Sequence, residues 1–312
     1  MTTRTPAITV RPLRPTDFVS LMGRTGGVGW WNGAKPSGRL GGDSSGSALV
    51  ASLLERLLPL ERRSAWVCYE DGELRGFIAA RQRTGRTVWE VDSLLLADGN
   101  MDEVSWPLLE SLTEEAGAQG VVKVFLRLSE DSVLLPAARR VGYTPYLRET
   151  LFAAVHPPIV DVELPGLEPR KRGDALDLYR LYASMAPVRV RQAEGLTLQE
   201  WQDTRDRKAS GPRARQWVLR SENSVQAWLA IQKERRTGFI DLLAVPTAPT
   251  TDLIRFGLEK LRCQIVLCLV PEYLSLHAAM EDSEFTPVAR YVSLLKPLAV
   301  RVPQARLVPA SA

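Results

Sequence analysis

The chain has 312 residues, of which 45% are hydrophobic and 24% charged, and it carries a formal net charge of +4. This composition is that of an ordinary globular protein, and at about 150 residues per domain the length predicts two domains. No apolar run reaches the length that spans a membrane, and the N-terminus lacks a signal pattern, so we expect a cytoplasmic protein with no membrane partner.

The positive charge lies entirely in the second half of the chain. Residues 1–156 contain 18 basic and 18 acidic residues, whereas residues 157–312 contain 22 and 18. This diffuse excess suits a small anionic ligand and argues against nucleic acid, which needs a clustered basic face with interleaved aromatic residues. His156 and His277 stand far apart and the three cysteines form no C-x-x-C, so no metal is expected.

The first half predicts strands and helices in alternation. Thr16 or Asp17 can cap a helix after an opening strand, and EDG at 70–72 is typical of a tight turn between two strands. Pro107 suits the first turn of a later helix, where its missing N–H costs nothing. The expected strands cover residues 8–13, 65–69, 74–82, 90–96, 121–128 and 146–155, and the expected helices residues 106–117 and 134–142.

The second half repeats three blocks of the first half in the same order. VRPLRPTDFVSL (10–21) aligns with LEPRKRGDALDL (167–178), AWVCYEDGELRGFIA (65–79) with QWVLRSENSVQAWLA (216–230), and GYTPYLRETLF (142–152) with EFTPVARYVSLL (284–295). Three matching blocks indicate a duplicated domain. We therefore expect an α/β fold with a mixed sheet in each copy.

This order of elements resembles the GNAT superfamily of N-acyltransferases, and two copies in one chain resemble its tandem members. VRPLRPTD (10–17) and ARRVGY (138–143) carry the resemblance. It implies two tandem GNAT-like acyl-CoA N-acyltransferase domains, each with central strands that diverge into a V around the thioester carrier. A single continuous sheet, or two halves that do not superpose, would refute this expectation.

The expected boundaries follow from the repeat. Residues 1–155 form the N-terminal domain and residues 167–312 the C-terminal domain. Residues 156–166, HPPIVDVELPG, form the linker and are expected to cross between the domains as an extended strand.

By the same resemblance, a loop of the pattern R-x-x-G-x-G should follow the fourth strand of each copy and bind the pyrophosphate of CoA. This loop is the acidic DGNMDE (98–103) in the first copy and PTAPTTD (246–252) in the second, and both lack the glycines. RTGGVG (24–29) has the pattern but follows a helix, so we interpret the match as accidental. The second copy is the better candidate for acetyl-CoA or another acyl-CoA, through Leu243, Val245, Thr250, Thr251 and Arg255.

Three further residues are candidates for chemistry or substrate contact. The resemblance places Glu90 where many family members have a general base; the alternative is a solvated carboxylate at a strand end. Phe239 stands at the matching position of the second copy. Trp30 and Trp31 either line the substrate cleft, as a lid or wall, or plug a gap between the domains.

The resemblance therefore implies transfer of an acetyl or longer acyl group from acyl-CoA to an amine of a small molecule or a protein. One copy would be catalytic and the other structural. Glu90 favours the first copy for the chemistry, whereas the less acidic loop and the net charge of +4 favour the second copy for CoA binding. The alternative is a catalytically inactive GNAT-fold protein that binds a metabolite or a partner protein.

Overall fold

The computed structural model describes residues 7–17, 20–21, 30–35, 63–99, 101–205, 214–221, 224–234 and 236–299. RTGGVG at 24–29 lies outside these ranges. Within them, no helix is both long enough and apolar enough to cross a membrane.

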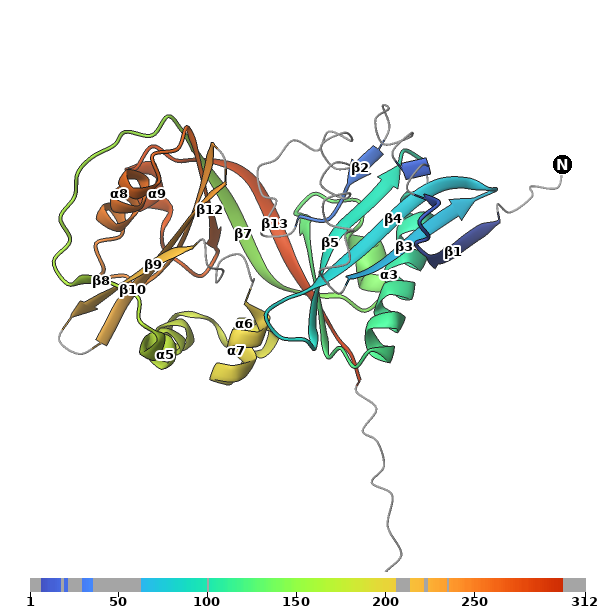
Figure 1. Ribbon diagram of the computed structural model, residues 1–312, viewed down its shortest axis with the longest axis horizontal. Helices are drawn as coiled ribbons and strands as arrows, with labels where there is room; N and C mark the ends of the chain where they lie inside the picture. The colour runs from blue at the N-terminus through green and yellow to red at the C-terminus, as the bar shows by residue number, and fades with distance from the viewer. Residues whose placement is uncertain are drawn as a thin grey trace, which may run out of the picture.

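The described strands form one mixed sheet of 13 strands, in the order β1-β3-β4-β5-β6-β13-β7-β12-β11-β10-β9-β8, with β2 paired to β5 (Figure 1). The first half supplies β1 Ile8–Pro12, β2 Trp30–Asn32, β3 Arg63–Glu70, β4 Glu73–Gln82, β5 Val88–Ala97, β6 Lys123–Ser129 and β7 Thr144–Val155. The second half supplies β8 Leu167–Pro169, β9 Arg215–Ser221, β10 Ser224–Glu234, β11 Thr237–Ala244, β12 Ile265–Pro271 and β13 Thr286–Pro297.

The duplication is visible in this order, which reads the same from either edge of the sheet toward its centre. Matched aspartates make matched contacts: Asp17 accepts a hydrogen bond from the N–H of Arg14, and Asp174 from the N–H of Lys171, each at 2.7 Å. Asp17 also accepts from Tyr69 of β3 at 2.8 Å, and Asp174 from a side chain of β9 at 2.7 Å. The sequence repeat therefore corresponds to a structural repeat.

The sheet is continuous because the two halves exchange their last strands. β7 pairs antiparallel with β12 of the second half, β13 pairs antiparallel with β6 of the first half, and β7 and β13 pair with each other. The expectation of a separate sheet in each copy was therefore wrong. Each half still has its own set of strands, but the strand that completes it comes from the other half.

The helices cover both faces of the sheet. They are α3 Met101–Ala118, α4 Leu135–Arg140, α5 Ala175–Met185, α6 Val188–Glu194, α7 Leu198–Thr204, α8 Thr250–Leu261 and α9 His277–Glu281, with a 3-10 turn at Arg172–Asp174. In the second half, α5, α6 and α7 lie on one face of the sheet, and α8 and α9 lie on the other (Figure 1).

Helix α3 starts at Met101 rather than at residue 106, so the placement of Pro107 in its first turn was wrong. Val104 and Leu108 are buried over β4, where Gly76 leaves room: a Cβ on Gly76 would lie 2.6 Å from Val104 and 2.7 Å from Leu108. This packing accounts for the additional helical turn ahead of Pro107, although proline lacks the N–H that a helix interior uses.

The linker of residues 156–166 runs from β7 to β8 without forming a strand (Figure 1). The expected extended strand is absent from this segment. Three of its residues are prolines, which have no N–H for a strand ladder.

Candidate active site

A cavity opens at the centre of the second half, where the parallel strands β11 and β12 diverge. Their pairing ends at Ile240 opposite Cys268. The cavity has a volume of about 270 Å³ and begins among the residues that follow this last pair, including Asp241 and Leu269. Helices α5 to α7 and strand β10 line it as well, and the first half contributes residues of β7 together with Arg83 and Arg127. Its size suits a small ligand or the reactive end of a larger one.

Glu194, the last residue of α6, is a partly buried carboxylate on the cavity wall. It accepts hydrogen bonds from the hydroxyls of Tyr182 on α5 at 3.0 Å and Tyr146 on β7 at 3.3 Å. Burial raises the pKa of Glu194, and the hydrogen bond from Tyr182 counteracts this only in part. A carboxyl group with a raised pKa is suited to exchange protons near neutral pH.

Arg205 follows α7 and lies between two indole rings. Its guanidinium carbon is 4.8 Å from the ring centre of Trp201 and 4.6 Å from that of Trp228. Burial lowers the pKa of Arg205, and the negative charge of Asp241 opposes this effect. Arg83 and Arg127 also line the cavity, and Arg205 is the arginine held there against two indole rings.

The first half of the chain fixes the end of α7. In the turn between β4 and β5, the Thr84 N–H and hydroxyl donate to the Arg205 carbonyl at 3.2 and 2.8 Å, and the Gly85 N–H donates to the Asp203 carbonyl at 2.8 Å. Arg83 donates to the Thr204 carbonyl at 2.8 Å. These bonds satisfy carbonyls that a helix end leaves unpaired, and they hold the backbone of Arg205 at the cavity.

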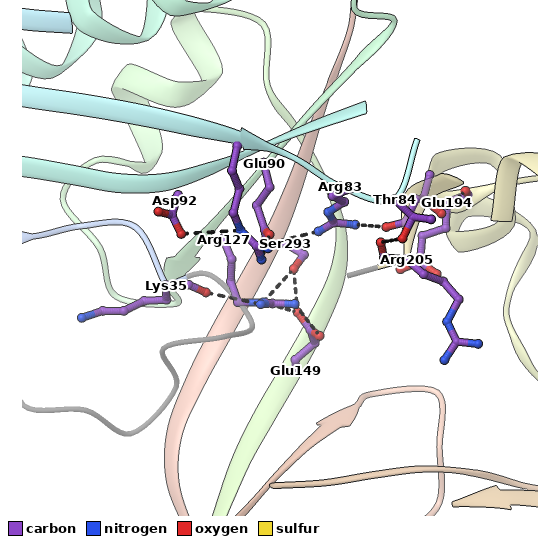
Figure 2. A network of polar contacts seen from close by, with 12 residues as sticks. Lys35, Arg83, Thr84, Glu90, Asp92, Arg127, Glu149, Glu194, Arg205 and Ser293 are labelled. Carbon is purple, nitrogen blue, oxygen red and sulfur yellow. Dashed lines mark hydrogen bonds and ion pairs between the residues drawn. The ribbon is translucent and has the colours of Figure 1, made fainter. Parts of the chain in front are cut away.

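A buried ion pair on the cavity wall joins the exchanged strands (Figure 2). Arg127 of β6 donates to Glu149 of β7 at 2.7 and 3.1 Å, and Ser293 of β13 donates to Glu149 at 2.6 Å. Burial by itself would lower the pKa of Arg127, but the attraction of Glu149 outweighs it and leaves the pKa above its usual value. The three strands are thus held together by a satisfied polar network.

In the described part of the first half, residues 30–35 bridge the corresponding diverging strands. β5 and β6 pair as far as Glu90 opposite Phe125. Beyond that point, Gly33 donates to the Leu94 carbonyl of β5 at 2.8 Å, and Lys35 donates to the Arg127 carbonyl of β6 at 2.9 Å. The backbone groups that a ligand would need in this gap are bonded to the protein itself.

Trp30 and Trp31 belong to this bridging segment. Both lie in β2, which pairs with β5, and neither lines the cavity of the second half. They pack against apolar residues of the first half. Of the two interpretations made from sequence, a plug is nearer to their placement, but the gap that the segment closes lies within the first half.

Glu90 is 1% exposed and does not line the cavity. It accepts from Arg81 at 2.7 Å and from Arg83 at 3.3 Å. The alternative of a solvated carboxylate was therefore wrong. A catalytic role for Glu90 stays a prediction, and its contacts are those of a buried ion pair.

The predicted CoA-binding residues lie at the end of the open strand β11 and in the segment and helix that follow it. Leu243 lies on the cavity wall, and Val245 comes just after the strand. Thr250 and Thr251 begin α8, a helix of 12 residues whose N-terminus has no side-chain cap. Its first N–H groups lack partners within the helix and favour an anion.

The two halves also differ in the acidic residues at the start of their corresponding helices, α8 and α3. Asp252 in the first turn of α8 opposes an anion, and Arg255 lies 4.0 Å from it. The corresponding helix of the first half, α3, carries Asp102 and Glu103 in its first turn. A pyrophosphate therefore fits the start of α8 better than the start of α3.

Sequence reasoning missed most of the cavity. Glu194 and Trp201 lie on helices of the second half for which the repeat gave no counterpart, and Arg205 directly follows one of them. Tyr146 was not among the candidates. The signal that could have drawn attention to them is the spacing of Trp201 and Arg205, four residues apart at the end of a helix.

Comparison with solved structures finds the same fold elsewhere. A GCN5-related N-acetyltransferase from Sphaerobacter thermophilus matches with a TM-score of 0.57 and 16% identity, over 94% of this chain and 98% of that one. A tandem GNAT protein from the clavulanic acid biosynthesis pathway matches with a TM-score of 0.53 and 14% identity, over 95% of this chain and 100% of that one. No family model and no curated protein matches the chain. The predicted tandem GNAT fold is thus confirmed.

Proposed function

We propose that this protein, which has the fold of tandem GNAT proteins, transfers an acyl group from acyl-CoA to an amine in the cavity of its second half. The observation that carries the proposal is the contrast between the halves. β11 and β12 diverge into a cavity, whereas residues 30–35 bridge the matching gap between β5 and β6. The second half would be catalytic and the first half structural.

Acyl-CoA would lie between β11 and β12, with its pyrophosphate at the start of α8. When bound, it supplies an acyl group activated as a thioester. Leu243 and Val245 would flank the part of the acyl-CoA molecule that joins the pyrophosphate to the thioester. Thr250 and Thr251 would contact the phosphates. Arg255, one turn further along α8, would add positive charge.

Two groups on the cavity wall suit the proton transfers of this reaction. Glu194 would accept a proton from the amine at a carboxylate oxygen, directly or through one of its two tyrosine partners. Tyr273 follows β12 on the cavity wall, and burial raises its pKa well above the usual value. Its hydroxyl therefore keeps its proton at neutral pH and can give it to a departing thiolate.

Thermal unfolding with acetyl-CoA tests the proposal. A ligand at 100 times its Kd adds about 2.7 kcal/mol to the free energy of unfolding. Thr251→Glu places a negative charge where the pyrophosphate would lie and should remove most of the melting shift. The added charge favours the helix itself, so folding is preserved. Val133→Glu adds the same charge at a residue that is 65% exposed and outside the cavity, and it should keep the shift.

A second candidate is a non-catalytic protein that binds a metabolite or a partner protein. Asp252 at the start of α8 and the absence of glycines before it favour this alternative. No melting shift with acetyl-CoA or longer acyl-CoAs, and no release of free CoA thiol with any amine, would support it. A shift that Thr251→Glu leaves unchanged would place acyl-CoA elsewhere and overturn the site proposed above.

A further inference from the structure

Among the residues that the structure describes, the guanidinium of Arg205 has aromatic neighbours but no hydrogen-bond acceptor. It lies between the rings of Trp201 and Trp228. Contacts with ring faces leave the N–H groups at the edge of the guanidinium unused. Arginine has five such donors in a planar fork.

A cation whose donors face a cavity and have no acceptor among the described residues is suited to bind an anion there. Three charged groups act on Arg205 electrostatically: Asp241 and Glu194 attract it, and Arg170 repels it. Asp241 and Glu194 line the same cavity but accept no hydrogen bond from Arg205. The planar fork of arginine matches a carboxylate or phosphate in two parallel hydrogen bonds.

The position of this cation is built into the fold. Thr84 holds the carbonyl of Arg205, and Trp201 and Trp228 hold its side chain from both sides. Glu194, proposed above to accept the amine proton, lies on the wall of the same cavity. One small molecule can therefore present an anionic group to Arg205 and an amine to Glu194.

We infer that the acyl acceptor is a small amine that also carries a carboxylate or a phosphate, and that Arg205 binds this anionic group. The inference rests on the proposed function and adds the chemical class of the acceptor. Neutral amines and polyamines would leave Arg205 without a partner and would bind weakly. Arg205 would set specificity by position and charge, and it would take no part in the proton transfers.

Matched pairs of amines provide the test, with the full-length protein and without acetyl-CoA. Each of the common α-amino acids is compared with its α-carboxamide, and phosphoethanolamine with ethanolamine, by thermal unfolding. The acids or the phosphate should raise the melting temperature, and their uncharged partners should not. Loss of a charged hydrogen-bonded pair should weaken binding by about 10- to 100-fold. The two sets of pairs distinguish a carboxylate from a phosphate.

Variants locate the effect. Arg205→Gln should abolish the difference between charged and uncharged partners, and Arg205→Lys should restore part of it, because it keeps the charge but loses the fork. Arg180→Gln removes an exposed arginine of α5 outside the cavity and should bind as the unmodified protein does. If Arg205→Gln fails to fold, the matched pairs on the unmodified protein and the Arg205→Lys variant still decide.

The inference falls if no anionic amine shifts the melting temperature, if charged and uncharged partners shift it equally, or if a folded Arg205→Gln variant keeps the difference. Failure of the proposed function has a different signature. In that case acetyl-CoA does not raise the melting temperature and no CoA thiol is released, regardless of how the amines affect the melting temperature.

Discussion

Gly85→Ala is expected to break the contact by which the first half holds α7 beside the cavity. The Gly85 N–H donates to the Asp203 carbonyl at 2.8 Å. A Cβ on Gly85 would lie 2.5 Å from the Cβ, 2.8 Å from the Cγ and 3.1 Å from the Cα of Asp203. Rotation of the Asp203 side chain cannot move its Cα and Cβ, so the turn between β4 and β5 has to withdraw.

The expected cost follows from these contacts. Overpacking of this kind costs about 1–3 kcal/mol. Withdrawal also weakens the Gly85 bond and the two bonds from Thr84 to the Arg205 carbonyl, each with a net value of about 1 kcal/mol. The smaller freedom of alanine in the unfolded chain returns roughly 0.4–1 kcal/mol. We expect the free energy of unfolding to fall by about 2–4 kcal/mol.

Urea unfolding measures this change, and Gly117→Ala is the matched control. Gly117 lies in α3, where a Cβ would meet no atom within 4 Å. Alanine there should stabilise the protein by about 0.5–1 kcal/mol, since glycine is a poor helix former. Gly85→Ala should also weaken the binding of anionic amines, because Arg205 loses its fixed backbone. A Gly85→Ala variant as stable as the unmodified protein would refute the tight contact between the halves.

Three further substitutions test the ionisable groups. Glu90→Gln should lower the free energy of unfolding by about 3 kcal/mol, because buried Arg81 loses a balancing charge, and should leave acetyl-CoA binding intact; lost turnover at unchanged stability would instead support a catalytic Glu90. Hydrogen bonds from Arg11 lower the pKa of Asp17 from 3.8 to about 2, so its stabilisation is present above pH 4 and is lost as the pH falls toward 2. Over this pH range the free energy of unfolding of the unmodified protein should fall by about 2 kcal/mol more than that of Asp17→Asn. Parallel acid-unfolding curves for the two proteins would contradict this. Because burial raises the pKa of Glu194 above 4.5, the folded protein holds its proton to a higher pH, and the acid limb of kcat/KM should lie above pH 4.5. Glu194→Gln should abolish turnover; a variant that keeps turnover with the same acid limb would exclude Glu194 as the base.

Local sequence signals predicted local structure well. The EDG turn forms as expected: Asp71 and Gly72 have φ values of 48° and 82°, in the left-handed region that such a turn requires. The aligned blocks placed Tyr69 and Arg220 at one position of the repeat, and both donate to the matched aspartate. The turn depends on residues that are neighbours in the chain, and the matched contacts depend on the duplication of the domain. Local residue patterns and internal repeats can both be recognised in a sequence.

The candidate site was only partly predictable. Leu243 was expected at the ligand site and lies on the cavity wall. Arg205 and Glu194 were not identified, because an arginine after a helix and a glutamate at a helix end are common on protein surfaces. Only their burial against Trp201, Trp228 and Tyr182 distinguishes them.

The sequence by itself determined the duplication and the strands that the repeated blocks share, and it predicted a poorer fit of the first half to an anionic cofactor. Only the tertiary structure decided which half keeps an open cavity and which strand completes each half. The physical reason is that β7 and β13 derive from the same repeat block, so that both carry Thr-Pro followed by an apolar pattern. Either strand could pair with β6 or with β12 by pattern, and the choice depends on long-range contacts such as Arg127 with Glu149 and Ser293.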